Sequence, residues 1–171
     1  MNQKVLVAYA TKYGATEEIA ERIGLALGNA GVAAEVLAVD KVKDVTAYAA
    51  VVLGSAVYIG GWRKEAAKFL QENEESLTTR PVWLFSSGPT GEGDPVEQMD
   101  GWTVPNKLKP VADRIRPREI VVFHGDVNVE KLNFMDRFMI KNVKAPTGDF
   151  RDWAAIDAWA EEIAASLVAQ H

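Results

Sequence analysis

The sequence predicts a doubly wound α/β fold, in which a five-stranded parallel sheet carries helices on both faces. Short apolar segments alternate along the chain with longer segments whose apolar residues recur at helical spacing, and this alternation is typical of parallel sheets. The 171 residues suffice for one sizeable core. Because no linker, repeat or low-complexity tract interrupts them, we expect a single domain over residues 1–171.

The predicted strands are short runs rich in aliphatic and β-branched residues. They are expected at residues 4–9, 34–39, 50–54, 81–86 and 119–124. A doubly wound sheet of five strands commonly has the order 2-1-3-4-5 and binds its ligands at the carboxyl ends of the strands.

The predicted helices have apolar residues three and four positions apart, so one face of each helix can cover the sheet. In the first helix, Ile19, Ile23 and Leu27 share such a face. The helices are expected at residues 16–29, 62–77, 104–115, 133–144 and 153–168. An extra, irregular segment at 125–151 separates the last strand from the last helix.

Composition excludes several kinds of site. Without cysteine, the chain has no disulfide, thiol nucleophile or cysteine-ligated metal. The imidazoles of His124 and His171 alone cannot build a multi-histidine metal site, and no protein acid or base stands out as catalytic. A net charge of -5 argues against nucleic-acid binding. Apolar runs are too short for a signal peptide or a membrane span, so we expect a cytoplasmic protein.

Three loops at the ligand-binding edge of the predicted sheet are rich in glycine and hydroxyl groups. They follow the first, third and fourth strands and read TKYGAT at 11–16, SAVYIGGW at 55–62 and SSGPTGEGDP at 86–95. One such loop has an ordinary structural explanation, since most strand-to-helix loops contain glycine and serine. Three of them at one edge predict a ligand site.

The first loop predicts an anion site. It leads into a helix N-terminus, where unpaired N–H groups and the helix dipole favour negative charge. Thr11 and Thr16 add hydroxyl donors, and Gly14 lets the backbone approach an anion closely. The loop lacks the GKS or GKT of a P-loop and the GxGxxG of a dinucleotide fold, so the expected phosphate is not that of ATP or NAD.

The residues around this loop resemble the signature of flavodoxins, which places an aromatic, spaced hydroxyls and a small residue between a strand and a helix. The matching residues are Val7, Tyr9, Thr11, Gly14, Thr16, Ala20 and Ile23. Ala8 departs from the signature, which usually has a larger residue there. The resemblance implies a flavodoxin-like fold and an FMN cofactor whose 5′-phosphate binds at residues 11–16. Lys12 would then contact the phosphate or remain solvated.

The same resemblance assigns the other two loops to the flavin ring. Tyr58 stands where flavodoxins carry an aromatic on the isoalloxazine face, although it could instead pack on the following helix. The third loop has no aromatic, so one face of the ring is expected to be open. The implied cofactor-binding residues are Thr11, Lys12, Tyr13, Gly14, Ala15, Thr16, Ser55, Ala56, Val57, Tyr58, Ile59, Gly60, Ser86, Ser87, Gly88 and Gly91.

The segment EKLNFMDRFMIKNVKAPTGDFRDW at 130–153 mixes basic and large apolar residues. From Lys131 to Lys144 it could form a basic amphipathic helix that docks on a membrane surface or an acidic partner, or one that simply covers the sheet edge. MDRFMIK at 135–141, followed by Trp153, resembles the menaquinone-dependent protoporphyrinogen dehydrogenases. That subgroup's role implies that FMN takes electrons from a porphyrin-type substrate and passes them to a quinone. The third loop and the shorter inserted segment depart from this subgroup.

Four functions can be compared with these observations. The first is an FMN oxidoreductase of the protoporphyrinogen dehydrogenase type, favoured by the basic segment and the open ring face. The second is a flavodoxin-type electron carrier with a redox protein partner, favoured by the net charge of -5. The third, a flavin-dependent quinone reductase, lacks a clear nicotinamide phosphate site. The fourth, a binding module without FMN, conflicts with the intact Thr11, Gly14 and Thr16.

Overall fold

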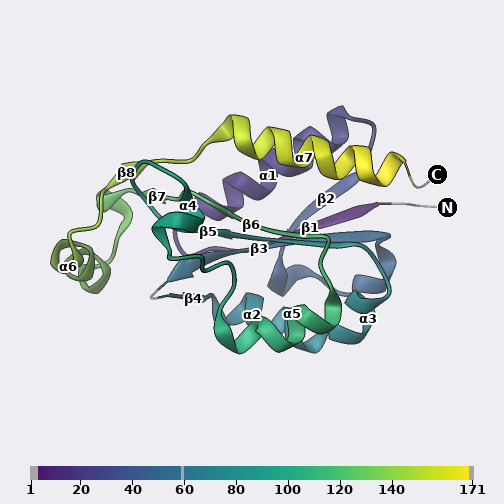
Figure 1. Ribbon diagram of the computed structural model, residues 1–171, viewed down its shortest axis with the longest axis horizontal. Coiled ribbons are helices and arrows are strands. Elements are labelled where there is room, and N and C mark those ends of the chain that lie inside the picture. The colour runs from purple at the N-terminus through teal and green to yellow at the C-terminus, as the bar shows by residue number, and fades with distance from the viewer. Residues whose placement is uncertain (1–3, 59, 170–171) are drawn as a thin grey trace.

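A parallel sheet lies between two layers of helices in the structure, a computed structural model that describes residues 4–58 and 60–169 (Figure 1). One face of the sheet is covered by α1 (Ala15–Asn29) and α7 (Trp153–Val168). The other is covered by α2 (Lys64–Glu72), α3 (Glu74–Thr78) and α5 (Lys109–Ile115). The predicted doubly wound α/β class is therefore confirmed.

The parallel strands have the order β2-β1-β3-β5-β6, which is the predicted order 2-1-3-4-5. Their bounds are β1 (Val5–Ala10), β2 (Ala34–Ala38), β3 (Ala50–Tyr58), β5 (Val82–Ser87) and β6 (Glu119–Phe123). In this register Ser55 of β3 is the partner of both Ala10 of β1 and Ser86 of β5. The three central strands therefore deliver their following loops to the same edge.

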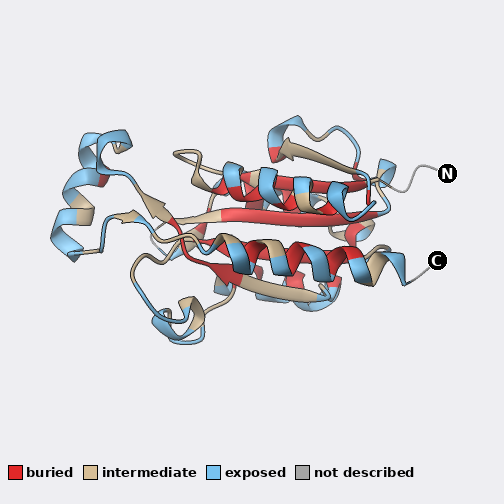
Figure 2. Ribbon diagram, turned by 90° about the horizontal axis from the view of Figure 1, so that it is seen from above, coloured by how far each residue is buried: buried red, intermediate tan, exposed pale blue. Residues whose placement is uncertain are grey.

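Apolar side chains fill both interfaces between sheet and helices, and the central strands are buried along most of their length (Figure 2). The predicted face of α1, formed by Ile19, Ile23 and Leu27, is fully buried. On the opposite side, Leu53 of β3 packs in the same core as Leu70 of α2. Such burial contributes about 1.5–3 kcal/mol for each large aliphatic side chain, so the sheet is a firm base for the loops at its edge.

The second loop differs from its prediction. β3 continues through residues 55–58, and the chain then turns back into β4 (Gly61–Trp62), which pairs antiparallel with the end of β3. Trp62, predicted to begin a helix, instead pairs with Val57, and its indole N–H donates to Ser86 Oγ at 2.8 Å. The helix begins at Lys64 because this hairpin and its cross-strand bond hold the indole in the sheet.

Two predicted helices are also shorter than expected. The helix predicted at 62–77 is divided at Asn73 into α2 and α3, and the Asn73 side-chain amide donates to the Phe69 carbonyl at 2.9 Å. The helix predicted at 104–115 becomes a 3-10 turn followed by α5, because Pro110 in the first turn lacks an N–H donor. The 3-10 turns of the fold lie at Val39–Lys41, Val45–Ala47, Asn106–Leu108 and Val129–Lys131.

The extra segment projects beyond the sheet edge, far from both chain ends (Figure 1). A two-stranded ribbon, β7 (Asp126–Val127) and β8 (Gly148–Asp149), carries α6 (Phe134–Val143) at its tip, and α4 (Pro95–Gln98) lies in the third loop. The predicted helix at 133–144 is thus confirmed. Asn133 caps it by accepting a hydrogen bond from the Asp136 N–H at 2.8 Å.

Gly54→Ala should lower the free energy of unfolding by about 2–3 kcal/mol. A Cβ atom at residue 54 would lie 2.0 Å from Cζ of the buried Phe85 ring. Urea unfolding at neutral pH measures the effect. Gly28→Ala is the control, because a Cβ there meets nothing within 4 Å and alanine favours the helix. Equal urea midpoints for the two variants would contradict this account of β3–β5 packing.

Candidate functional site

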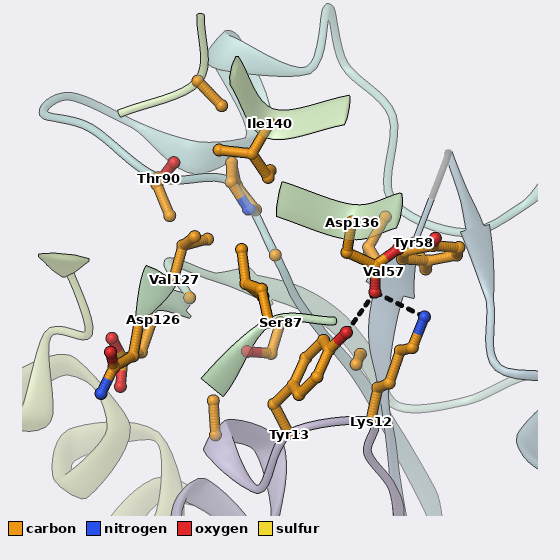
Figure 3. Close-up of a pocket in the computed structure, with 18 of the residues that line it drawn as sticks. Lys12, Tyr13, Val57, Tyr58, Ser87, Thr90, Asp126, Val127, Asp136 and Ile140 are labelled. Atoms are coloured by element: carbon orange, nitrogen blue, oxygen red, sulfur yellow. Dashed lines mark hydrogen bonds and ion pairs between the residues drawn. The ribbon is translucent and has the colours of Figure 1, made fainter. Parts of the chain in front are cut away.

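A cavity of about 520 Å³ opens at the carboxyl edge of the sheet (Figure 3). This size is usual for small-molecule sites. The loops after β1 and β5 and the end of β3 line one part of it, and the extra segment lines the rest through residues that include Asp126, Leu132, Asp136 and Ile140. The predicted meeting of three loops is therefore present, with a fourth wall that the sequence did not assign.

The first loop has the geometry of an anion seat. Gly14 is the N-cap of α1 with a φ of 94°, a conformation that favours glycine. Its N–H donates to Thr11 Oγ1 at 3.0 Å, which tightens the loop. Ala15 and the buried Thr16 line the cavity at the start of the helix, where backbone N–H groups lack intrahelical partners.

Close backbone contacts shape the cavity floor. A Cβ on Gly88 would lie 2.8 Å from Val57 Cβ, and one on Gly125 would lie 3.0 Å from the Gly88 carbonyl oxygen. All three residues line the cavity. Glycine at positions 88 and 125 is thus required for the end of β3 and the loops after β5 and β6 to meet.

Two predicted hydroxyls lie outside the cavity lining and serve the fold. Ser55 Oγ accepts from the Arg63 N–H at 3.0 Å and donates to the Ala56 carbonyl. Ser86 Oγ accepts from the Trp62 indole and donates to the Thr103 carbonyl at 3.2 Å. Both serines are completely buried, so their bonds hold the loops in position.

The structure brings most of the predicted site residues together. Those that line the cavity are Thr11, Lys12, Tyr13, Ala15, Thr16, Ala56, Val57, Tyr58, Ser87 and Gly88. Within the described part of the chain, the predicted residues outside the lining are Gly14, Ser55, Gly60, Ser86 and Gly91. Ile59 lies outside the described residues.

Four polar side chains form a cluster at one wall of the cavity (Figure 3). Lys12 Nζ lies 2.6 Å from Asp136 Oδ2. The hydroxyls of Tyr13 and Tyr58 both donate to the same carboxylate. The ammonium also lies 4.2 Å from the centroid of the Tyr58 ring. The first loop and the end of β3 are thereby joined to α6.

These contacts shift the pKa values of the cluster in consistent directions. Burial alone would raise the pKa of the Asp136 carboxyl, but hydrogen bonds from Lys12, Tyr13 and Tyr58 outweigh it and lower the pKa to about 2. The bond to Asp136 raises the pKa of the Lys12 ammonium. The same carboxylate raises the pKa of the Tyr58 hydroxyl. The cluster is therefore a carboxylate and an ammonium at neutral pH.

Sequence reasoning missed Asp136 and the apolar wall beside it. Asp136 is only 3% exposed, whereas the basic amphipathic helix expected from the sequence would carry its charges at the surface. Met139, Ile140 and Val143 of α6 line the cavity. A lone acid within FMDRFMI was the available signal, but an acid in a first helical turn has an ordinary explanation in the helix dipole.

His124 has a structural place. It is buried after β6, and its two ring nitrogens lie 3.0 Å from the Pro89 carbonyl and 2.7 Å from the Gly93 carbonyl. It therefore holds the third loop in position.

Among residues 4–58 and 60–169, no cluster of three or more histidine, aspartate or glutamate side chains could hold a metal. In the same residues, no helix combines the length and apolarity that a membrane crossing requires.

Comparisons with known proteins agree with this architecture. A family model described as flavodoxin domain matches residues 6–153. Protoporphyrinogen IX dehydrogenase (quinone) of Escherichia coli strain K12 is 23% identical over 172 residues, covering 94% of each chain. The flavodoxin of Streptococcus pneumoniae TIGR4 superposes with a TM-score of 0.59 at 18% identity, over 95% of this chain and 99% of that one. Rubredoxin oxygen:oxidoreductase of Desulfovibrio gigas gives 0.62 at 14% identity, but the match covers 98% of this chain and 36% of the larger protein.

Asp136→Asn should lower the free energy of unfolding by about 1 kcal/mol at pH 7. Because the folded-state pKa of Asp136 is about 2, below its ordinary value of 3.8, the contribution of the Asp136 carboxylate to stability is complete above the unfolded-state pKa. It is lost as the pH falls from about 4 to about 2. Urea unfolding of both proteins across this range measures it. A difference that stays constant down to pH 2 would contradict the assigned ionisation.

Proposed function

The chain belongs to the flavodoxin domain family, and from that premise we propose that it is an FMN-dependent oxidoreductase acting on flat, apolar small molecules of the quinone or porphyrin type. The observation that carries the proposal is the shared cavity. An anion seat at the start of α1 opens into the same space as the apolar side of α6. The 23% identity to the E. coli protoporphyrinogen IX dehydrogenase supports this class of reaction.

The residues at the start of α1 suit the phosphate of FMN. The left-handed Gly14 turns the chain so that N–H groups of the first helical turn lie at the cavity. The buried Thr16 can add a hydroxyl donor. The Lys12 ammonium is paired with Asp136 and would therefore not contact this phosphate. A phosphate in this seat would therefore be bound by neutral donors and the helix dipole.

The remaining walls suit a flat ring and an apolar partner. Val57, Tyr58 and Gly88 lie beside the cavity where β3 and β5 end. Across the cavity, Met139 and Ile140 of α6 offer flexible and aliphatic side chains. When bound, FMN would supply the electron and hydride chemistry. The chain's own residues would then orient the ring and exclude water on the side of α6.

An electron carrier without its own substrate is the second candidate. The net charge of -5 favours docking to a basic redox protein. The apolar lining contributed by α6 argues for a small-molecule partner instead, since a carrier needs no enclosed space beside its flavin.

The exposed side of α6 suits an anionic membrane surface. Phe134, Met135 and Phe138 are 84%, 77% and 60% exposed. The cationic residues beside them, from Lys131 onward, are Lys131, Arg137, Lys141 and Lys144. Large apolar groups flanked by cations are typical of helices that lie in a lipid headgroup layer. Peripheral binding there would present the cavity to lipid-soluble quinones.

Gly14→Val and Thr16→Val should each weaken FMN binding at least tenfold, equivalent to about 1.4 kcal/mol. Valine cannot easily adopt the φ of 94° at residue 14, and valine at residue 16 removes a hydroxyl with little change of shape. Fluorescence titration of FMN measures the dissociation constants. Thr79→Val is the control, because Thr79 is the exposed C-cap of α3 and does not line the cavity. Unchanged FMN affinity in both variants would refute the phosphate seat.

Anaerobic dithionite titration of the FMN-loaded protein distinguishes the two candidate functions. A single two-electron transition in the visible spectrum is expected for the oxidoreductase, and reduction by protoporphyrinogen with reoxidation by menaquinone would then be measured. Two well-separated one-electron transitions would favour the carrier. Absence of FMN binding at micromolar concentration would refute both.

Replacing Phe134 and Phe138 together by serine should reduce binding to vesicles of 30% anionic lipid at least tenfold, because each phenyl group stabilises the bound state by apolar burial. Co-sedimentation measures the bound fraction. Leu25→Ser is the matched control, since Leu25 is 61% exposed on α1, away from α6. Equal binding by the double variant and the control would remove α6 as the membrane contact, and weak binding by the unmodified protein would favour an acidic protein partner.

A further inference from the structure

Three hydrogen-bond donors from the sheet edge converge on one carboxylate of α6. The Lys12 ammonium lies 2.6 Å from Asp136 Oδ2, and the hydroxyls of Tyr13 and Tyr58 donate to the two carboxylate oxygens. Lys12 and Tyr13 belong to the first loop, and Tyr58 ends β3. All four residues line the cavity. The donors therefore form a preorganised set whose acceptor comes from a separate part of the fold.

This carboxylate is also the principal attachment of α6. In this fully described helix, Asp136 is the single buried residue. Phe134, Met135 and Phe138 face solvent, and Figure 2 shows most of the projecting helix as exposed. A helix of a folded domain is ordinarily attached by its apolar stripe. Here the attachment is polar.

We propose that Lys12, Tyr13 and Tyr58 form an oxyanion-binding site in the cavity wall, and that Asp136 is its built-in, displaceable occupant. The site would bind a carboxylate or phosphate oxyanion of an incoming ligand. Asp136 would then enter solvent and release α6 from the sheet edge. The proposal adds a second anion site to the cavity of the proposed function, and one arm of its test rests on that function.

The donor chemistry determines the ligand class. An ammonium and two phenol hydroxyls offer donors and positive charge, and a carboxylate or phosphate accepts several such bonds at once. In Figure 3 the Lys12 side chain extends toward Asp136 and Tyr58, so this site is distinct from the backbone seat at the start of α1. The neighbouring Met139 and Ile140 would contact the apolar part of the same ligand.

An external oxyanion can displace Asp136 because the number of hydrogen bonds to Lys12, Tyr13 and Tyr58 is conserved in the exchange. An incoming oxyanion takes over the hydrogen bonds that Asp136 leaves, and the released carboxylate regains its hydration. The tethered carboxylate acts as a competitor at an effective concentration of about millimolar or higher. External anions can bind only while Asp136 is out of the site. Their apparent affinity should therefore equal the intrinsic affinity multiplied by the fraction of time for which the site is free of Asp136.

The first arm of the test measures binding of butyrate and inorganic phosphate by calorimetry. Asp136→Ala should bind at least one of them about tenfold more tightly than the unmodified protein, with Asp136→Asn intermediate because its amide oxygen still accepts. Glu130→Ala, which removes an exposed acid from the same segment, should show no gain. Adding Lys12→Met to Asp136→Ala should abolish the gain. Thermal unfolding verifies that each variant is folded.

The second arm identifies the source of the oxyanion by comparing FMN with riboflavin. A gain in Asp136→Ala for FMN but not for riboflavin would identify the flavin phosphate as the displacing group. A gain for butyrate with unchanged FMN affinity would identify the carboxylate of a second ligand. If FMN fails to bind any variant, the proposed function falls while the butyrate and phosphate measurements still decide the oxyanion site.

Hydrogen exchange of the α6 amides provides a structural readout. Adding the tighter-binding probe to the unmodified protein should accelerate exchange at residues 134–143, as Asp136→Ala does without ligand. The proposal is overturned if no anion binds Asp136→Ala more tightly than the unmodified protein, or if the gain persists without the Lys12 ammonium. It is also overturned if probe binding leaves α6 exchange unchanged.

Discussion

The parallel registration of β1, β3 and β5 is the constraint on which the site depends. Ser55 is the partner of both Ala10 and Ser86, so the last residues of β1 and β5 lie beside the second half of β3, which continues to Tyr58. Their loops must therefore leave the sheet at one edge. The buried serine hydroxyls then fix the rim, because they hold Arg63 and Trp62 at the turn that follows β3. A cavity assembled from three segments can keep its shape only if these ends are fixed together.

Local physics made the first strand, loop and helix predictable. The apolar run of β1, the left-handed Gly14 and the stripe of Ile19, Ile23 and Leu27 are each recognisable from neighbours in sequence. The extension of β3 was not recognisable in this way. Its last residues become strand because β4 returns beside them, and Trp62 joins the sheet because its indole meets Ser86 on another strand. Tertiary pairing overrode the helical periodicity of that segment.

Asp136 illustrates a stricter limit on reasoning from sequence. Within α6 it occupies a position where an acid is favourable near the helix N-terminus, so the local pattern suggested a solvent-exposed charge. Its actual partners lie 123 and 78 residues away, at Tyr13 and Tyr58. Nothing in the spacing of FMDRFMI specifies that the ribbon of β7 and β8 will place this helix against the sheet edge. The fold had to be known before the carboxylate could be assigned.

The two C-terminal helices differ in how firmly they are held. α7 buries Ile156 and Ile163 completely, and exposing each would cost about 1.5–3 kcal/mol. Water cannot replace those contacts, so α7 is a permanent part of the core. α6 instead depends on a carboxylate whose hydrogen bonds can be exchanged with water or another oxyanion at small net cost. Its cavity-facing Met139 and Ile140 are only partly buried. The wall of the cavity that would contact the proposed ligand is therefore the wall that the fold holds least firmly.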